Sequence, residues 1–181
     1  MTDRLDSTTP SAPATRGAPM ATSGHAPRRY ELCLADSAAT DRLAAAVAAL
    51  ARPGDVILLK GDLGTGKTRF ARGFIAARAG HALDVPSPTF TLVQTYELPG
   101  GAVWHFDLYR LERPQDAAEL GLDEAFADGI SLVEWPDRLG GAMPADRLEI
   151  ALAYGDAPEE RRVTLSGFGR WADLLPRISH A

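Results

Sequence analysis

Residues 55–78 read DVILLKGDLGTGKTRFARGFIAAR, and this stretch decides the fold. The apolar run at 55–60 predicts a buried strand, and residues 68–78 have the pattern of a helix. Between them, residues 61–68 match the phosphate-binding pattern G-x-x-x-x-G-K-[ST] at every defined position. In such a strand–loop–helix unit, backbone N–H groups surround a phosphate and the helix N-terminus adds positive potential. The stretch therefore predicts a nucleotide-binding protein.

The phosphate-binding pattern also assigns roles to single residues. The residues expected to contact the nucleotide along the loop are Asp62, Leu63, Gly64, Thr65 and Gly66. Lys67 would bridge the β- and γ-phosphates, and the Thr68 hydroxyl would hold Mg²⁺. Lys67 is one of two lysines against seventeen arginines, which favours a role for a compact point charge that a planar guanidinium group does not supply. The alternative is a glycine-rich turn with a solvated lysine.

Composition and charge narrow the class of protein. The chain of 181 residues is 45% apolar and 24% charged, which is typical of one soluble globular domain. Its net charge of −5 at pH 7 argues against broad nucleic-acid binding, although a local arginine patch stays possible. No apolar run is long enough for a transmembrane helix, and the histidines have no zinc-like spacing. We expect no membrane partner and a cytoplasmic location; the sequence does not give the oligomeric state.

The chain divides into a tail and a body. Residues 1–29 are rich in Ser, Thr, Pro and Ala and lack the apolar segment of a signal peptide, so we expect a disordered tail. Residues 30–181 are expected to form a single domain of the ATPase type described below. Cys33 lies in the first expected strand, where a reduced, half-buried thiol is the simplest interpretation.

The remaining pattern predicts an α/β fold. The expected elements, in chain order, are a strand at 30–34, a helix at 37–51, the strand, loop and helix of 55–78, an antiparallel pair at 89–98 and 102–109, one or two short helices at 114–128 broken at Gly121, a strand at 129–135, two strands at 147–154 and 161–168, and a helix at 169–178. This order predicts a P-loop NTPase-like, three-layer α/β/α arrangement. Its sheet would be mixed and mainly parallel, with antiparallel additions.

Two acids stand at the ends of apolar strands and complete the candidate site. A second oxygen ligand for Mg²⁺ is expected at such a position, and Asp107 and Glu134 both qualify. Glu134 follows the more apolar strand and is our choice for the metal, while Asp107 could orient the attacking water or hold a metal-bound water. Either acid could instead be a solvated strand end. Trp135 could cover the nucleotide or only anchor the strand end, and Thr89 could sense the γ-phosphate or only stabilise a turn.

Taken together, these motifs resemble one family. They are GDLGTGKT at 61–68, SPTFTL at 87–92, HFDLYRL at 105–111, ELG at 119–121 and VEWP at 133–136. In combination they resemble the TsaE (YjeE) family over about residues 30–170. The His-x-Asp-x-Tyr-Arg and Glu-Trp-Pro motifs discriminate this family from other phosphate-loop proteins, and the long segment before Tyr30 departs from it.

The resemblance implies a function beyond what the residues show. Members of the family are small α/β ATPases, weak in isolation, that act with TsaD and TsaB. That pair transfers a threonylcarbamoyl group to the adenosine next to the anticodon of tRNAs reading ANN codons, and TsaC supplies the activated group. A family member would not perform the transfer itself, and its contact with tRNA would be indirect.

The resemblance also carries residue roles. Thr68 and Glu134 would hold Mg²⁺, Lys67 would hold the phosphates of ATP, and Asp107 would support hydrolysis. The residues placed near the nucleotide are Thr40, Trp135 and Asp137.

Two other functions remain open, and a third is nearly excluded. A small-molecule or nucleoside kinase shares the loop and the fold, but needs an acceptor site. A GTPase normally carries an [NT]-K-x-D motif, and its absence nearly excludes that function, because Lys60 is the only lysine outside the loop. A binding module would hold ATP without hydrolysing it.

Overall fold

The computed structural model describes residues 27–178, except for the side chains of residues 114 and 118. The expected tail thus lies outside the described residues up to position 26. The first strand begins at Arg28, two residues before the predicted start, since the backbones of Arg28 and Arg29 pair with a neighbouring strand. Backbone pairing does not require apolar side chains, so the composition of residues 28–29 did not predict that they belong to the strand. None of the helices in 27–178 has the length and apolarity to cross a membrane.

Seven strands alternate with four α-helices and two 3₁₀ helices in the described residues. In chain order they are β1 Arg28–Leu34, α1 Ser37–Leu50, β2 Val56–Lys60, α2 Lys67–Ala79, β3 Val93–Tyr96, β4 Val103–Asp107, η1 Pro114–Leu120, α3 Leu122–Asp128, β5 Ile130–Glu134, η2 Pro136–Ala142, β6 Leu148–Tyr154, β7 Arg161–Gly167 and α4 Arg170–Ile178. The predicted break between two short helices at Gly121 is confirmed, because this glycine has a left-handed backbone.

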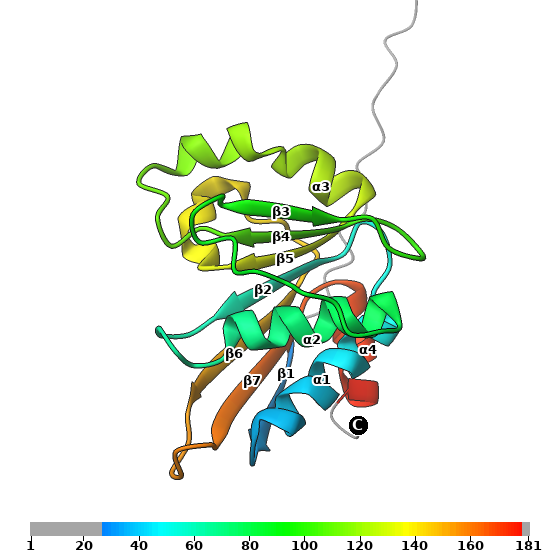
Figure 1. Ribbon diagram of the computed structural model, residues 1–181, viewed down its shortest axis with the longest axis vertical. Helices are drawn as coiled ribbons and strands as arrows, with labels where there is room; N and C mark the ends of the chain where they lie inside the picture. The colour runs from blue at the N-terminus through cyan, green and yellow to red at the C-terminus, as the bar shows by residue number, and fades with distance from the viewer. Residues whose placement is uncertain (1–26, 179–181) are drawn as a thin grey trace, which may run out of the picture.

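The strands form one mixed sheet in the order β1-β7-β6-β2-β5-β4-β3 (Figure 1). β6, β2, β5 and β4 are mutually parallel neighbours, whereas β7 and β3 run antiparallel to the strands beside them. The expected α/β class, the parallel core and the antiparallel hairpin of β3 and β4 are all confirmed.

Helices cover the sheet in two layers. Alternate residues of β2 divide between them: Ile57 and Leu59 pack with α1, α2 and α4, while Val56 and Leu58 pack with α3 and the 3₁₀ helices. Figure 1 shows α1, α2 and α4 gathered on one side of the sheet. β5 is buried along its whole length between β2 and β4, in agreement with its apolar sequence.

The expected half-buried Cys33 is wrong, because its side chain is exposed. Tyr30, Leu32 and Leu34 face the helical layer of α1 and α4, so the intervening Cys33 points to the opposite face of the sheet. Hydrogen bonding to Glu160 and the nearby acids raise the pKa of its thiol. The thiol is therefore a poor nucleophile at neutral pH.

Parallel strands place the ends of β2, β4 and β5 at one edge of the sheet. In register, Asp107 at the end of β4 lies opposite Glu134 at the end of β5, and Leu59 of β2 lies opposite Glu134 from the other side. The phosphate-binding loop leaves β2 at this same edge and leads into α2. The topology thus assembles the candidate site from three separate parts of the chain.

Candidate functional site

The loop between β2 and α2 depends on glycine conformations. Gly61 has φ 133°, and a side chain there would collide with the carbonyl oxygen of Leu152. Gly66, with φ 108°, is the residue before the first turn of α2. Both conformations disfavour any residue with a Cβ. The chain can therefore turn tightly and aim the first N–H groups of α2 into the site.

Lys67 points back into the loop. Its ammonium donates to the carbonyl oxygens of Gly61 at 2.7 Å and Asp62 at 2.8 Å. The Nζ atom also lies 4.0 Å from the centroid of the Trp135 ring, which places a cation over an aromatic face. Lys67 is only 5% exposed. All three N–H groups of the ammonium can thus be satisfied locally.

Burial lowers the pKa of the Lys67 ammonium, although the carboxylates of Glu134, Asp107 and Asp62 oppose the shift. The folded protein thus holds a desolvated cation that the surrounding acids only partly compensate. A ligand that brings negative charge to this position would relieve that cost.

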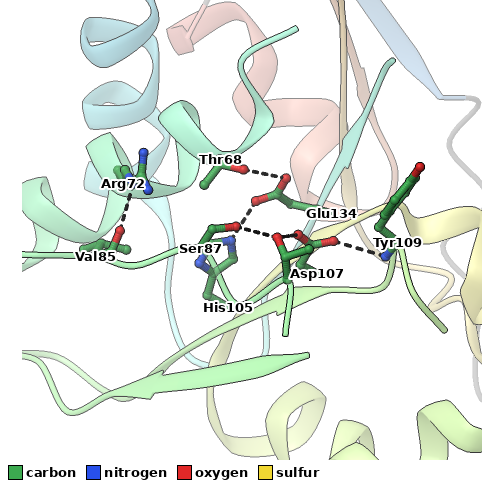
Figure 2. A network of polar contacts seen from close by, with 9 residues as sticks. Thr68, Arg72, Val85, Ser87, His105, Asp107, Tyr109 and Glu134 are labelled. Carbon is green, nitrogen blue, oxygen red and sulfur yellow. Dashed lines mark hydrogen bonds and ion pairs between the residues drawn. The ribbon is translucent and has the colours of Figure 1, made fainter. Parts of the chain in front are cut away.

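The two strand-end acids are buried, and Figure 2 shows the carboxylate of Glu134 turned toward Thr68 and that of Asp107 beside Ser87 and Tyr109. The Thr68 hydroxyl donates to Oε2 of Glu134 at 3.0 Å. Asp107 accepts from the Thr89 hydroxyl at 2.7 Å through Oδ2 and from the backbone N–H of Tyr109 at 3.1 Å through Oδ1. Neither acid is a solvated strand end, since Asp107 is 4% and Glu134 2% exposed. A carboxylate has lone pairs to spare beyond these bonds, so both acids can accept further partners.

The segment at 86–92 is hydrogen-bonded to Asp107 through both a side chain and the backbone. Ser87 and Thr89 share a hydrogen bond of 2.7 Å, and Leu92 accepts from the backbone N–H of Asp107 at 3.0 Å. Leu92 has φ 64°, an unfavourable conformation for a residue with a side chain. Its own N–H donates to the carbonyl of Pro88 at 2.6 Å, which closes the turn and helps to hold this conformation. A movement of this segment would thus reach Asp107 directly.

A cavity of about 300 Å³ lies between these elements. It is lined by Leu63, Gly64, Gly66, Lys67, Thr68, Arg69, Ser87, Thr89, Asp107, Tyr109, Glu134 and Trp135. The structure therefore brings together most of the predicted residues. Trp135 adopts a left-handed backbone, and its ring lies 5.0 Å from that of Tyr109, so it forms one wall.

Four predicted residues do not line this cavity. Thr40 is buried within α1, and Asp137 is exposed at the start of η2. Asp62 contributes its carbonyl oxygen to Lys67 and Thr65, and the Thr65 side chain is buried against that carbonyl. Their contact with nucleotide stays a prediction.

The donors present fit a magnesium ion. Mg²⁺ prefers oxygen ligands in octahedral geometry at 2.0–2.1 Å, so neighbouring ligands lie about 2.9 Å apart. The Thr68 and Glu134 oxygens are separated by 3.0 Å, close to that spacing. Mg²⁺ in nucleotide sites needs only one or two protein ligands because phosphates and waters supply the rest. Nothing among residues 27–178 forms a cluster of three or more acids, histidines or cysteines able to hold a metal by itself.

Sequence reasoning included His105 and Tyr109 in the motif at 105–111 but gave neither a role, and it did not name Arg69 or Ser87 as site residues. His105 is fully buried beside Glu134, and Tyr109, Arg69 and Ser87 line the cavity. The period of two along β4 could have identified His105, since it places His105 and Asp107 on the same face of the strand. No local signal could have identified the partner of His105, which lies on another strand.

Comparison with known proteins identifies one family. The family model described as "Threonylcarbamoyl adenosine biosynthesis protein TsaE" matches residues 34–163. A tRNA threonylcarbamoyladenosine biosynthesis protein TsaE from Rickettsia bellii is 42% identical over 117 residues, which are 65% of this chain and 81% of that protein. The protein of the same name from Bacillus subtilis is 41% identical over 138 residues, which are 75% of this chain and 84% of that protein.

A solved structure gives the same result for the fold. The crystal structure of Bacillus subtilis YdiB superposes with a TM-score of 0.71 and 34% sequence identity. The match covers 87% of this chain and 98% of YdiB. Since the family model spans most of the chain and the fold agrees over nearly all of a solved relative, this protein belongs to the TsaE family.

Proposed function

We propose that this protein binds and hydrolyses ATP in support of threonylcarbamoyladenosine formation in tRNA. The observation that carries the proposal is the convergence of Lys67, Thr68, Asp107 and Glu134 around one cavity at the ends of β2, β4 and β5. The names of its relatives supply the pathway. The proposed place of action is the cytoplasm, where tRNA is modified.

Each residue of the cavity has its own role in this proposal. The loop N–H groups and Lys67 bind the β- and γ-phosphates, for which Lys67 exchanges its carbonyl partners for phosphate oxygens. Thr68 and Glu134 hold Mg²⁺, which when bound neutralises charge on the phosphates. Asp107 orients the attacking water with a lone pair that Thr89 and Tyr109 leave free. Trp135 closes one side of the cavity and limits access of bulk water.

Hydrolysis acts on partner proteins in this proposal, and the partners are TsaD and TsaB. Apolar side chains around the mouth of the cavity support docking there. Leu63 and Tyr109 line it, Phe90 follows Thr89, and the Tyr154 hydroxyl donates to the carbonyl of Leu63. All four are exposed; among the described residues only Leu83 is a further exposed large apolar side chain. Apolar groups concentrated at a functional site are typical of interaction surfaces.

The test is phosphate release measured with ATP alone, then with TsaD–TsaB, and then with tRNA added. We expect slow turnover alone and acceleration by TsaD–TsaB, because a partner can complete a catalytic site as an arginine-supplying partner does for GTPases. The acceleration should vanish in Lys67→Ala. Depletion of the protein should also lower threonylcarbamoyladenosine in cellular tRNA.

Two results would contradict the proposal. One is tRNA modification that is unaffected by loss of the protein. The other is a small-molecule acceptor phosphorylated at the rate of ATP consumption, which would identify a kinase.

A further inference from the structure

His105 is a buried polar residue to which the proposed function gives no role. It lies on β4 opposite Leu132 of β5, on the face that α2 covers, and is fully buried. Glu134 lies two residues along β5 from Leu132, so its side chain is on the same face of that strand. The side chains of His105 and Glu134 therefore share one face of two neighbouring strands. This register brings the imidazole to the carboxylate from beneath the cavity.

The imidazole and the Thr68 hydroxyl hold different oxygens of Glu134. Nε2 of His105 lies 2.9 Å from Oε1, and the Thr68 hydroxyl donates to Oε2 (Figure 2). Because a carboxylate can only accept, Nε2 carries the shared proton and donates it. A carboxylate fixed at one oxygen by a buried partner cannot rotate freely. Oε2 is therefore held toward Thr68, where the cation is expected.

The second ring nitrogen indicates that this bond is what the histidine provides. Nδ1 is buried and has no hydrogen-bond partner among the described residues. An unpartnered buried polar atom destabilises a fold, whereas an apolar residue of similar size would pack without that cost. A histidine at this position is thus unfavourable for packing alone, and the bond to Glu134 is its one polar interaction in the described structure.

We propose that His105 is a positioning residue that orients Glu134 for the magnesium ion. The inference rests on the proposed function, since it assumes the metal at Thr68 and Glu134. His105 does not touch the cation or the nucleotide and acts only through the carboxylate. Outer partners of metal ligands typically change metal affinity by about tenfold to a hundredfold when they are removed.

The experiment compares His105→Gln with His105→Met. The two side chains have nearly the same length, and only Gln retains a donor near the position of Nε2. Calorimetry at one fixed pH measures ADP affinity with chelator and then with Mg²⁺, so the readout is the gain in affinity that Mg²⁺ produces. We expect ADP affinity without Mg²⁺ to be unchanged within about twofold in both variants. The Mg²⁺ gain should fall about tenfold or more in His105→Met and stay within about threefold of wild type in His105→Gln.

Each outcome separates the hypotheses. If Mg²⁺ does not change the ADP affinity of the wild-type protein, the proposed metal site is overturned, and the inference with it. If Mg²⁺ increases the ADP affinity of wild type and of His105→Met equally, only the role of His105 is overturned. If His105→Met does not fold, His105→Asn replaces it. The amide of this shorter side chain lies near the position of Nδ1, where it does not reach Glu134. Equal Mg²⁺ gains in His105→Asn and His105→Gln would then overturn the inference.

Discussion

Charged side chains are used differently around the cavity and between β2 and β6. Around the cavity, buried charges contact neutral partners: Lys67 contacts two carbonyls and an aromatic ring, and Asp107 accepts from a hydroxyl and an N–H. Outside the cavity, Glu149 of β6 instead pairs directly with Lys60 at the end of β2 and with Arg147. The first arrangement leaves charge available for a ligand, and the second neutralises it within the fold.

Two lowered pKa values express this contrast. Burial lowers the pKa of Lys67, so the fold disfavours its charged form. Burial alone would raise the pKa of Glu149, but hydrogen bonds from Lys60 and Arg147 outweigh it and lower that pKa, so the fold favours its charged form. The same direction of shift thus marks a stability cost at the site and a stability gain away from it. Strained or costly charges are expected where function requires them.

The largest expected effect is that of Lys67→Ala. Loss of a charge-assisted interaction of about 1.5–3 kcal/mol should weaken ATP binding about tenfold to a hundredfold, with a larger loss of turnover. Calorimetry measures the affinity, and phosphate release measures the turnover. Lys60→Ala is the matched control, since this second lysine pairs with Glu149 instead of lining the cavity. Unchanged ATP affinity and turnover in Lys67→Ala would mean that the loop does not bind phosphate.

Asp107→Ala should retain nucleotide binding and lose turnover by about a hundredfold or more, because the attacking water loses its orienting acceptor. Binding by calorimetry and phosphate release, measured on the same preparation, test this. Thr89→Val serves as a companion variant that removes one hydrogen bond to the carboxylate and should reduce turnover less. Weakened ATP binding with normal turnover per bound ATP would assign Asp107 to the metal instead.

Glu134→Ala should shift the Mg²⁺ requirement for nucleotide binding upward by about tenfold, since a direct ligand is lost. Titration of Mg²⁺ at fixed ADP gives the midpoint. A phenotype exchanged with that of Asp107→Ala would show that the two carboxylates have the opposite roles.

Glu149→Gln should have the smallest effect, a loss of about 1 kcal/mol in the free energy of unfolding near neutral pH with nucleotide binding unchanged. Its folded-state pKa is lowered from 4.5, so the stabilisation is present above that value and is lost as pH falls through the folded pKa. Urea unfolding at neutral and acid pH measures the difference between variant and wild type, which should vanish in acid. Asp156→Asn is the control, because its ion pair with Arg162 is exposed. A difference that grows on acidification would contradict the assignment.

The sequence by itself determined the local units. Residues 61–68 specified a phosphate-binding loop, and the apolar runs before Asp107 and Glu134 identified both as strand-end acids. These features are encoded in consecutive residues, through periodicity and glycine spacing, so they can be predicted without knowledge of the rest of the chain. The start of β1 was misplaced because the pairing of Arg28 depends on backbone groups of β7.

Only the tertiary structure decided which units meet and what covers them. Strand order and register place Asp107 opposite Glu134 and bring His105 to the carboxylate that Thr68 also contacts. The same dependence exposes Cys33, since helices cover only one face of β1. These contacts join residues far apart in the chain, and their free energy depends on packing and burial that no local pattern contains.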